Sequence, residues 1–80
     1  MNAQKRLEWL TNVLSVNGRV LTLEDTRDTV SEWDSMGDLM LLSSLEEDHK
    51  INISADELAS VASVGDLFGL LERKYAFPAG

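Results

Sequence analysis

Six serine residues in this chain have an acidic residue three positions later, and three of these pairs stand at the start of a segment with helical spacing of apolar residues. These three pairs are Ser35 and Asp38, Ser54 and Glu57, and Ser63 and Asp66. In such a pair the serine oxygen accepts a hydrogen bond from a backbone N–H of the first helical turn, and the acid suits the positive end of the helix dipole. The sequence therefore predicts three helix starts between residues 35 and 63.

Apolar residues repeat with helical spacing after these starts and also near the N-terminus. Leu7, Leu10 and Leu14 lie at positions i, i+3 and i+7 of a first helix, which Asn17 and Gly18 are expected to end. The third helix is expected to be short because the cap of the fourth follows it closely. The predicted helices cover about residues 3–15, 35–49, 55–61 and 64–75.

Residues 16–34 have no helical period, and a connection of this length is unusual in a compact domain and often functional. The apolar residues expected to hold it against the helices are Val20, Leu21, Leu23, Val30 and Trp33. We therefore expect an all-α fold. It is a four-helix bundle with three longer helices, one short third helix and a long loop between the first and second helices.

The chain is short and acidic. Its 80 residues correspond to a single domain, and the absence of cysteine excludes a disulfide framework, a thiolate zinc site and a thiol nucleophile. The net charge is −7, and residues 24–66 hold twelve acids against Arg27 and Lys50. Such a surface repels nucleic acid and anionic membranes and favours encounter with a basic protein. A surface that only keeps the chain soluble accounts for the same charge.

No apolar run has the length of a signal peptide core or of a membrane-spanning helix. We therefore expect a cytoplasmic protein that does not insert into membranes. We also expect a monomer.

The helix predicted over residues 35–49 presents two different faces. A helical wheel places Leu39, Leu41, Leu42, Leu45 and His49 on the core side. It places Met36, Met40, Ser43, Ser44 and Glu47 on the opposite side. Methionines on a polar face either form an adaptable surface for partners or pack against the long loop, and the wheel favours neither. For His49 a packing or capping role is expected rather than catalysis.

Ser35 admits three interpretations. At a helix start it is expected to be the N-cap. As a catalytic nucleophile it lacks a base, because the single histidine, His49, lies about 21 Å away along the same helix. As a serine modified by another enzyme it needs only exposure, because backbone N–H groups and the helix dipole would favour an attached phosphate.

Three segments, in the same order along the chain, resemble the acyl carrier protein family. The run from Trp33 to Leu39 is similar to that family's Asp-Ser-Leu modification motif, with methionine in place of leucine. Residues 45–51 resemble the acidic end of its second helix, and residues 63–67 resemble the start of its last helix. The resemblance spans residues 7–75 and implies a small, acidic, free-standing carrier with an acyl-carrier-like four-helix bundle.

The resemblance implies a protein that carries cargo and is not itself an enzyme. A phosphopantetheinyl transferase would attach 4′-phosphopantetheine to Ser35, and the arm's sulfur would carry an acyl, aminoacyl or ketide thioester between loading and downstream biosynthetic enzymes. The residues expected to dock the basic surfaces of these partners are Asp34, Met36, Met40, Glu46 and Glu47. By analogy, Leu39, Val61 and Ala62 would line a cleft that shelters an apolar chain. Fatty acid, polyketide, peptide and D-alanyl pathways all stay open.

A second interpretation belongs to a different class of function. The chain would be an unmodified, carrier-like binding module that docks a basic protein and uses Ser35 only as a helix N-cap. A small hydrolase is disfavoured because the sequence offers neither a base near Ser35 nor a set of metal ligands.

Overall fold

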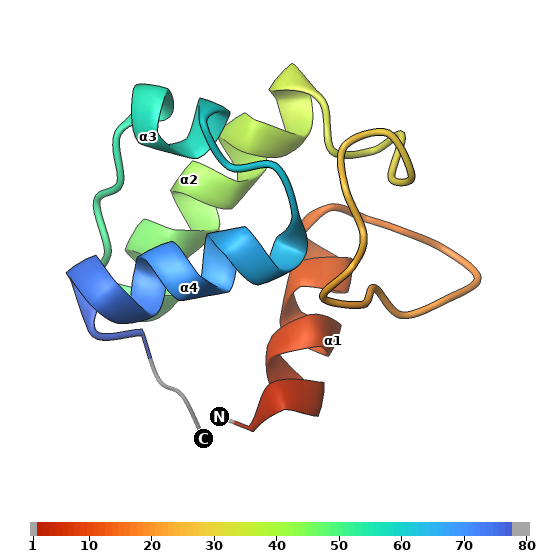
Figure 1. Ribbon diagram of the computed structural model, residues 1–80, viewed down its shortest axis with the longest axis horizontal. Helices are drawn as coiled ribbons and strands as arrows, with labels where there is room; N and C mark the ends of the chain where they lie inside the picture. Colours follow the sequence, from red (N-terminus) through yellow and green to blue (C-terminus); the bar gives the residue numbers. More distant parts are fainter. Residues whose placement is uncertain (1, 78–80) are drawn as a thin grey trace.

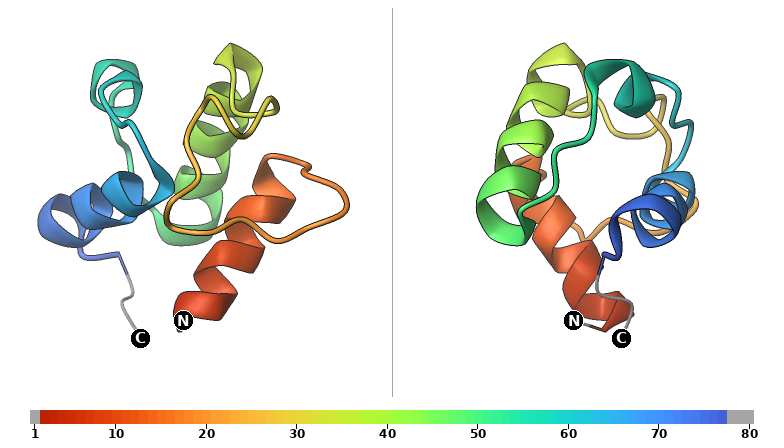
Figure 2. Two further views of the ribbon diagram at one scale, coloured as in Figure 1. Left: turned by 45° about the vertical axis from the view of Figure 1, so that its right-hand side comes forward. Right: turned by 90° about the vertical axis from the view of Figure 1, so that its left-hand side faces the viewer.

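The computed structural model describes residues 2–77, and within them the chain forms four helices and no β-strand. The helices are α1 (Ala3–Val13), α2 (Ser35–His49), α3 (Ala55–Ala59) and α4 (Val64–Tyr75). The long connection between α1 and α2 runs along one side of the molecule, and the short α3 lies beside α2 (Figures 1 and 2). The prediction of an all-α bundle with three longer helices, a short third helix and a long first loop is therefore confirmed.

The predicted bounds are confirmed for α2 and α4, whereas α1 is shorter than predicted. It ends at Val13 because Ser15 takes the left-handed conformation, with φ of 59°, directly after the C-cap residue Leu14. The expected stop at Asn17 and Gly18 is wrong, since both residues lie in the loop beyond this turn.

The third helix is also two residues shorter than predicted. It ends at Ala59, and the N–H of Val61 then donates to the carbonyl oxygen of Leu58 at 3.1 Å in a tight turn. This turn buries the Val61 side chain in the core. Packing of Val61 thus ends a helix that the capping pattern alone would extend.

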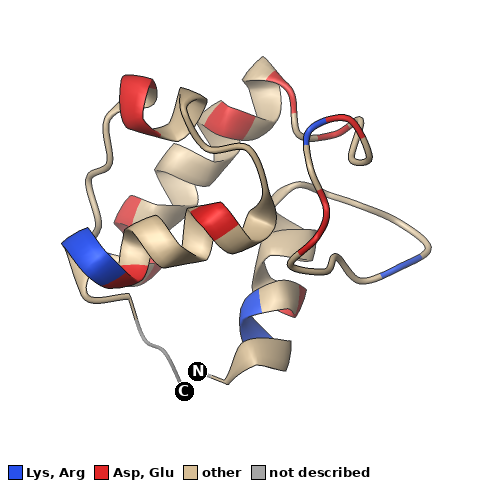
Figure 3. Ribbon diagram, viewed as in Figure 1, with Lys and Arg blue, Asp and Glu red and all other residues tan. Residues whose placement is uncertain are grey.

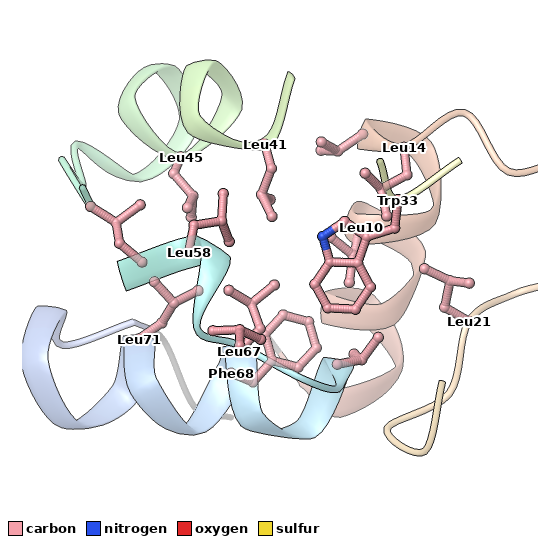
Figure 4. Packing of buried hydrophobic residues seen from close by; sticks show 14 of the residues in the cluster. Leu10, Leu14, Leu21, Trp33, Leu41, Leu45, Leu58, Leu67, Phe68 and Leu71 are labelled. Atoms are coloured by element: carbon pink, nitrogen blue, oxygen red, sulfur yellow. The ribbon is translucent and has the colours of Figure 1, made fainter. Parts of the chain in front are cut away.

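The hydrophobic core lies between the helices and is completed by residues of the long loop (Figure 4). Fully buried leucines come from every helix: Leu10 from α1, Leu41 and Leu45 from α2, Leu58 from α3, and Leu67 and Leu71 from α4. Trp33 is the largest of the fully buried side chains and comes from the loop just before α2. The start of α2 is therefore fixed by a bulky side chain that enters the core.

Three of the five apolar loop residues act as predicted. Leu21, Val30 and Trp33 are buried, but Val20 and Leu23 remain 42% and 46% exposed, so that part of the prediction is wrong. At Leu23 the backbone makes the attachment, because its carbonyl oxygen accepts a hydrogen bond from the Gly65 N–H at 2.9 Å. The side chain is consequently left on the surface.

A buried carboxylate, Asp25, organises the long loop. Arg19 donates two hydrogen bonds to it, both at 2.9 Å, while the Thr22 N–H and the Thr29 hydroxyl each donate one at 2.8 Å. The Arg19 guanidinium holds the pKa of Asp25 well below its usual range, and these threonines assist against the opposing effect of burial. The Asp25 carbonyl accepts a bond from the Val64 N–H at 2.9 Å, so the loop is also tied to the first turn of α4.

The short α3 is attached to α4 by Glu57. Glu57 completes the predicted capping box with Ser54, and its carboxylate accepts bonds from Lys74 Nζ at 2.8 Å and from the Tyr75 hydroxyl at 2.5 Å. The ammonium of Lys74, followed by the Tyr75 hydroxyl, lowers the pKa of Glu57 to about 2. One side of α3 is thereby fixed to the last turn of α4.

Candidate functional site

The first turn of α2 presents Ser35 without using its hydroxyl. Asp34 is the N-cap residue, because its backbone is extended and its carboxylate accepts a hydrogen bond from the Gly37 N–H at 3.0 Å. Ser35 is the first helical residue, is exposed, and its hydroxyl makes no hydrogen bond with any residue between 2 and 77. The interpretation of Ser35 as the N-cap is therefore wrong. Two strong capping residues are adjacent here, and the structure uses the first of them.

This assignment of the cap predicts different costs for two neighbouring substitutions. Asp34→Ala is expected to lower the free energy of unfolding by about 1 kcal/mol, because a backbone N–H loses its acceptor. Ser35→Ala is expected to change it by less than about 0.5 kcal/mol, because the exposed hydroxyl makes no hydrogen bond within residues 2–77. Urea titration of both variants measures the difference. A larger loss of unfolding free energy in Ser35→Ala than in Asp34→Ala would show that Ser35 is the N-cap.

Gly37 allows the chain before α2 to lie directly on the first turn of the helix. A Cβ at this position would collide with the backbone carbonyl oxygen of Glu32 and would approach the Leu14 side chain to 3.1 Å. The requirement here is close packing, and glycine meets it because it has no side chain. Gly37 thus allows the loop backbone at Glu32 to pack directly against the first turn of α2, next to Asp34 and Ser35.

A cleft of about 400 Å³ lies between α2 and α3 and reaches Ser35. Its lining residues are Ser35, Asp38, Leu39 and Leu42 from α2 and Ala55, Asp56, Leu58 and Ala59 from α3. Leucine and alanine side chains form most of the lining, with one carboxylate from each helix. The arrangement can hold a small apolar group close to Ser35.

The predicted cleft residues are only partly correct. Leu39 does line the cleft, but it is 61% exposed, so its assignment to the core is wrong. Val61 is buried in the core and Ala62 is exposed, and neither lines the cleft. The reason is that α3 ends at Ala59, which leaves both residues in the connection to α4.

Exposed apolar side chains continue from the cleft along α2. Met36 and Met40 are 64% and 40% exposed, so the alternative in which they pack against the long loop is not what the structure shows. The other predicted docking residues, Asp34, Glu46 and Glu47, are exposed as well. The structure therefore places the five predicted docking residues on the surface of one helix and its cap.

The acids Asp34, Glu46 and Glu47 form no ion pair within residues 2–77. Figure 3 shows where the acidic and basic residues lie along the ribbon. Four ion pairs occur within residues 2–77: Arg6 with Glu72, Arg19 with Asp25, Arg27 with Asp38, and Lys74 with Glu57. None of them involves Asp34, Glu46 or Glu47. These carboxylates are consequently available to a basic partner.

The far end of α2 is held by aromatic packing around His49. Its ring lies edge-to-face with Trp9, at 5.1 Å between centroids, and with Phe77, at 4.7 Å. The Trp9 Nε1–H donates to Asp48 at 2.8 Å, which joins α1 to the same turn. This geometry agrees with the packing role expected for His49, which lies at the opposite end of α2 from Ser35.

Arg27 is a site residue that the sequence argument did not single out. Its Nη1 donates to both carboxylate oxygens of Asp38, at 3.0 and 3.1 Å, and its guanidinium stacks over the Trp33 ring at 4.6 Å. The Trp33 Nε1–H donates to the same carboxylate at 3.0 Å. A lone arginine within a strongly acidic segment is the signal that would have pointed to such a pairing.

No group of three histidine, cysteine or acidic side chains in residues 2–77 is arranged to hold a metal ion. Within the same residues, every helix is too short or too polar to span a bilayer.

Comparison of the chain with family models, curated proteins and solved structures finds no match.

Proposed function

We propose that this chain is a carrier of the acyl carrier protein type, with Ser35 as the attachment point for 4′-phosphopantetheine. A phosphopantetheinyl transferase installs the arm, whose thiol then carries an acyl, aminoacyl or ketide group as a thioester. Partner enzymes perform all of the chemistry, and the carrier presents the bound group to each of them in turn.

The observation that carries this proposal is the unused hydroxyl of Ser35. Because Asp34 caps α2, Ser35 is exposed and keeps its oxygen free at the positive end of a fifteen-residue helix. A phosphodiester formed there lies close to backbone N–H groups and to the favourable end of the dipole. Modification at this position requires no base within the chain, because the transferase supplies the chemistry.

The surroundings of Ser35 support the same function. The cleft between α2 and α3 begins at Ser35 and offers an apolar surface to part of the cargo. Exposed Met36 and Met40, with Glu46 and Glu47, give partners a contact surface that combines apolar area and charge, since neither glutamate forms an ion pair within residues 2–77. Electrostatic steering speeds encounter without requiring tight binding, which suits a cargo that must visit several enzymes.

The test is modification of the purified chain by a broad-specificity phosphopantetheinyl transferase with coenzyme A. Intact-mass measurement is expected to show the addition of one phosphopantetheine arm to the wild type and none to Ser35→Ala. Ser43→Ala is the matched control, because Ser43 is an exposed serine further along the same helix, and it is expected to be modified fully.

A wild-type chain that a panel of transferases leaves unmodified would contradict the proposal. The remaining function would then be docking of a basic protein through the exposed carboxylates of Asp34, Glu46 and Glu47. Modification of Ser35→Ala would likewise contradict it, because the arm would then be attached elsewhere.

A further inference from the structure

Arg27 connects the two walls of the cleft. From the long loop it binds Asp38, which lines the cleft on α2, through both carboxylate oxygens. Its Nη2 also donates to the carbonyl oxygen of Leu58 at 3.0 Å, and Leu58 lines the cleft on α3. A weaker bond runs from its Nε to the Val61 carbonyl at 3.5 Å. One guanidinium thus joins the first turn of α2 to the last turn of α3.

The α3 wall depends on such attachments because the helix is very short. Five residues are too few for a helix to be stable without tertiary contacts. Leu58 anchors α3 in the core, and Glu57 fixes it to Lys74 and Tyr75 of α4. Arg27 supplies the attachment toward α2. Without Arg27, α3 would keep its bonds to α4 while its distance from α2 became less restricted.

We infer that Arg27 sets the separation between α2 and α3 and so limits the size of the group that the cleft admits. Arg27 is a positioning residue in this role, since it acts through Asp38 and Leu58 and does not line the cleft itself. The identity of the bound group as thioester cargo rests on the proposed function. The restraint on α3 does not, because it exists in the unmodified chain.

The restraint requires the forked geometry of arginine. The guanidinium reaches Asp38 and Leu58 through different nitrogens while its face lies on the Trp33 ring. A lysine ammonium is a single point charge without a planar face, so it cannot make the paired and stacked contacts together. Arg27→Lys is therefore expected to restore only part of what Arg27→Gln loses.

The first experiment measures local opening by amide hydrogen exchange in the unmodified chain. In Arg27→Gln, the amides of α3 (Ala55–Ala59) and its C-cap Ser60 are expected to exchange about fivefold faster than in the wild type, which corresponds to about 1 kcal/mol. The amides of α1 and α4 are expected to be unchanged. Asp38→Asn breaks the pair from the other side and is expected to give the same pattern.

Arg19→Gln is the matched control. It breaks an arginine–aspartate pair in the same loop that touches neither wall of the cleft. Its α3 amides are expected to exchange as in the wild type. Equal acceleration of α3 in Arg19→Gln and Arg27→Gln, uniform acceleration of all helices in Arg27→Gln, or no acceleration in either Arg27→Gln or Asp38→Asn would overturn the inference.

The second experiment measures the size limit with two soluble thioesters, acetyl- and octanoyl-N-acetylcysteamine. The methyl resonances of Leu39 and Leu42, which line the cleft, report binding. Arg27→Gln is expected to bind the octanoyl compound about fivefold more tightly than the wild type, with no change for the acetyl compound. Equal changes for both compounds, or no gain for the octanoyl compound, would overturn the size limit.

These measurements are independent of whether Ser35 is modified. If the transferase assay fails while Arg27→Gln opens α3 and gains affinity for the octanoyl compound, the proposed carrier function is wrong and the inference about Arg27 stands. If the transferase assay succeeds and α3 is unaffected by Arg27→Gln, the carrier function stands and the inference about Arg27 is wrong.

Discussion

Replacing Gly37 by alanine is expected to lower the free energy of unfolding by about 2 kcal/mol, although alanine is the better helix former. The added Cβ would collide with the carbonyl oxygen of Glu32, a backbone atom that cannot rotate away. Overpacking costs about 1–3 kcal/mol, and a collision with a backbone atom belongs at the upper end of that range. The gain in helix propensity offsets about 1 kcal/mol, which leaves a net loss of about 2 kcal/mol. The loop must therefore move away from the first turn of α2, or the turn must unwind.

Thermal unfolding followed by circular dichroism measures this effect, and a fall in Tm of about 10 °C is expected for a domain of this size. Gly69→Ala is the matched control. Gly69 lies inside α4, and a Cβ there would meet only the flexible guanidinium of Arg73 at 3.3 Å. That variant is expected to be as stable as the wild type or up to about 1 kcal/mol more stable. A Gly37→Ala variant that also gains stability would refute the close packing of the loop on α2.

Asp25→Asn is expected to be the most destabilising conservative change in the loop, at about 3 kcal/mol. The asparagine side chain has only one acceptor oxygen, because an NH2 donor replaces the second carboxylate oxygen. It therefore cannot accept the two guanidinium bonds of Arg19 together with the bonds from Thr22 and Thr29. A buried donor facing another donor costs its desolvation energy as well as the lost bond. Asp28→Asn, an exposed neighbour, is expected to stay within about 0.5 kcal/mol of the wild type.

The pH dependence of the free energy of unfolding distinguishes the contribution of the ionised Asp25 carboxylate from that of an uncharged side chain of the same shape. The pKa of Asp25 lies below its ordinary value of 3.8 in the folded chain, so the unfolded chain binds protons first. The stabilisation is present above about pH 4 and is lost as the pH falls. Urea titrations from pH 7 to pH 2 are expected to show a steeper acid loss in the wild type than in Asp25→Asn. Equal slopes would mean that Asp25 carries no depressed pKa.

Glu57 contributes to the same acid loss in both chains. Its pKa falls from an ordinary value of 4.5 to about 2, so its stabilising bonds to Lys74 and Tyr75 also weaken as the pH drops through this interval. The difference between wild type and Asp25→Asn cancels this shared contribution and isolates Asp25.

Local signals in the sequence specified the helical framework. The Ser54 and Ser63 caps operate as predicted, and the bounds of α4 follow from its cap and apolar periodicity. The helix α2 also has its predicted bounds, although Asp34 caps it in place of Ser35. These features depend on residues within one turn of each other, which a sequence displays directly. The candidate modification site was also visible, since Asp34, Ser35 and the methionines of α2 are neighbours in the chain.

Contacts between distant residues decided the rest. Asp34 and Ser35 are both residue types that cap helices well. Asp34 is the N-cap in the folded chain, where the loop backbone at Glu32 packs against Gly37. A helical wheel placed Leu39 in the core, but α3 is too short to cover it, so Leu39 lines an open cleft. The pairing of Arg27 with Asp38 and Leu58 joins three segments of the chain. Periodicity describes the face of one helix, whereas burial depends on what packs against that face, and only the tertiary structure supplies this.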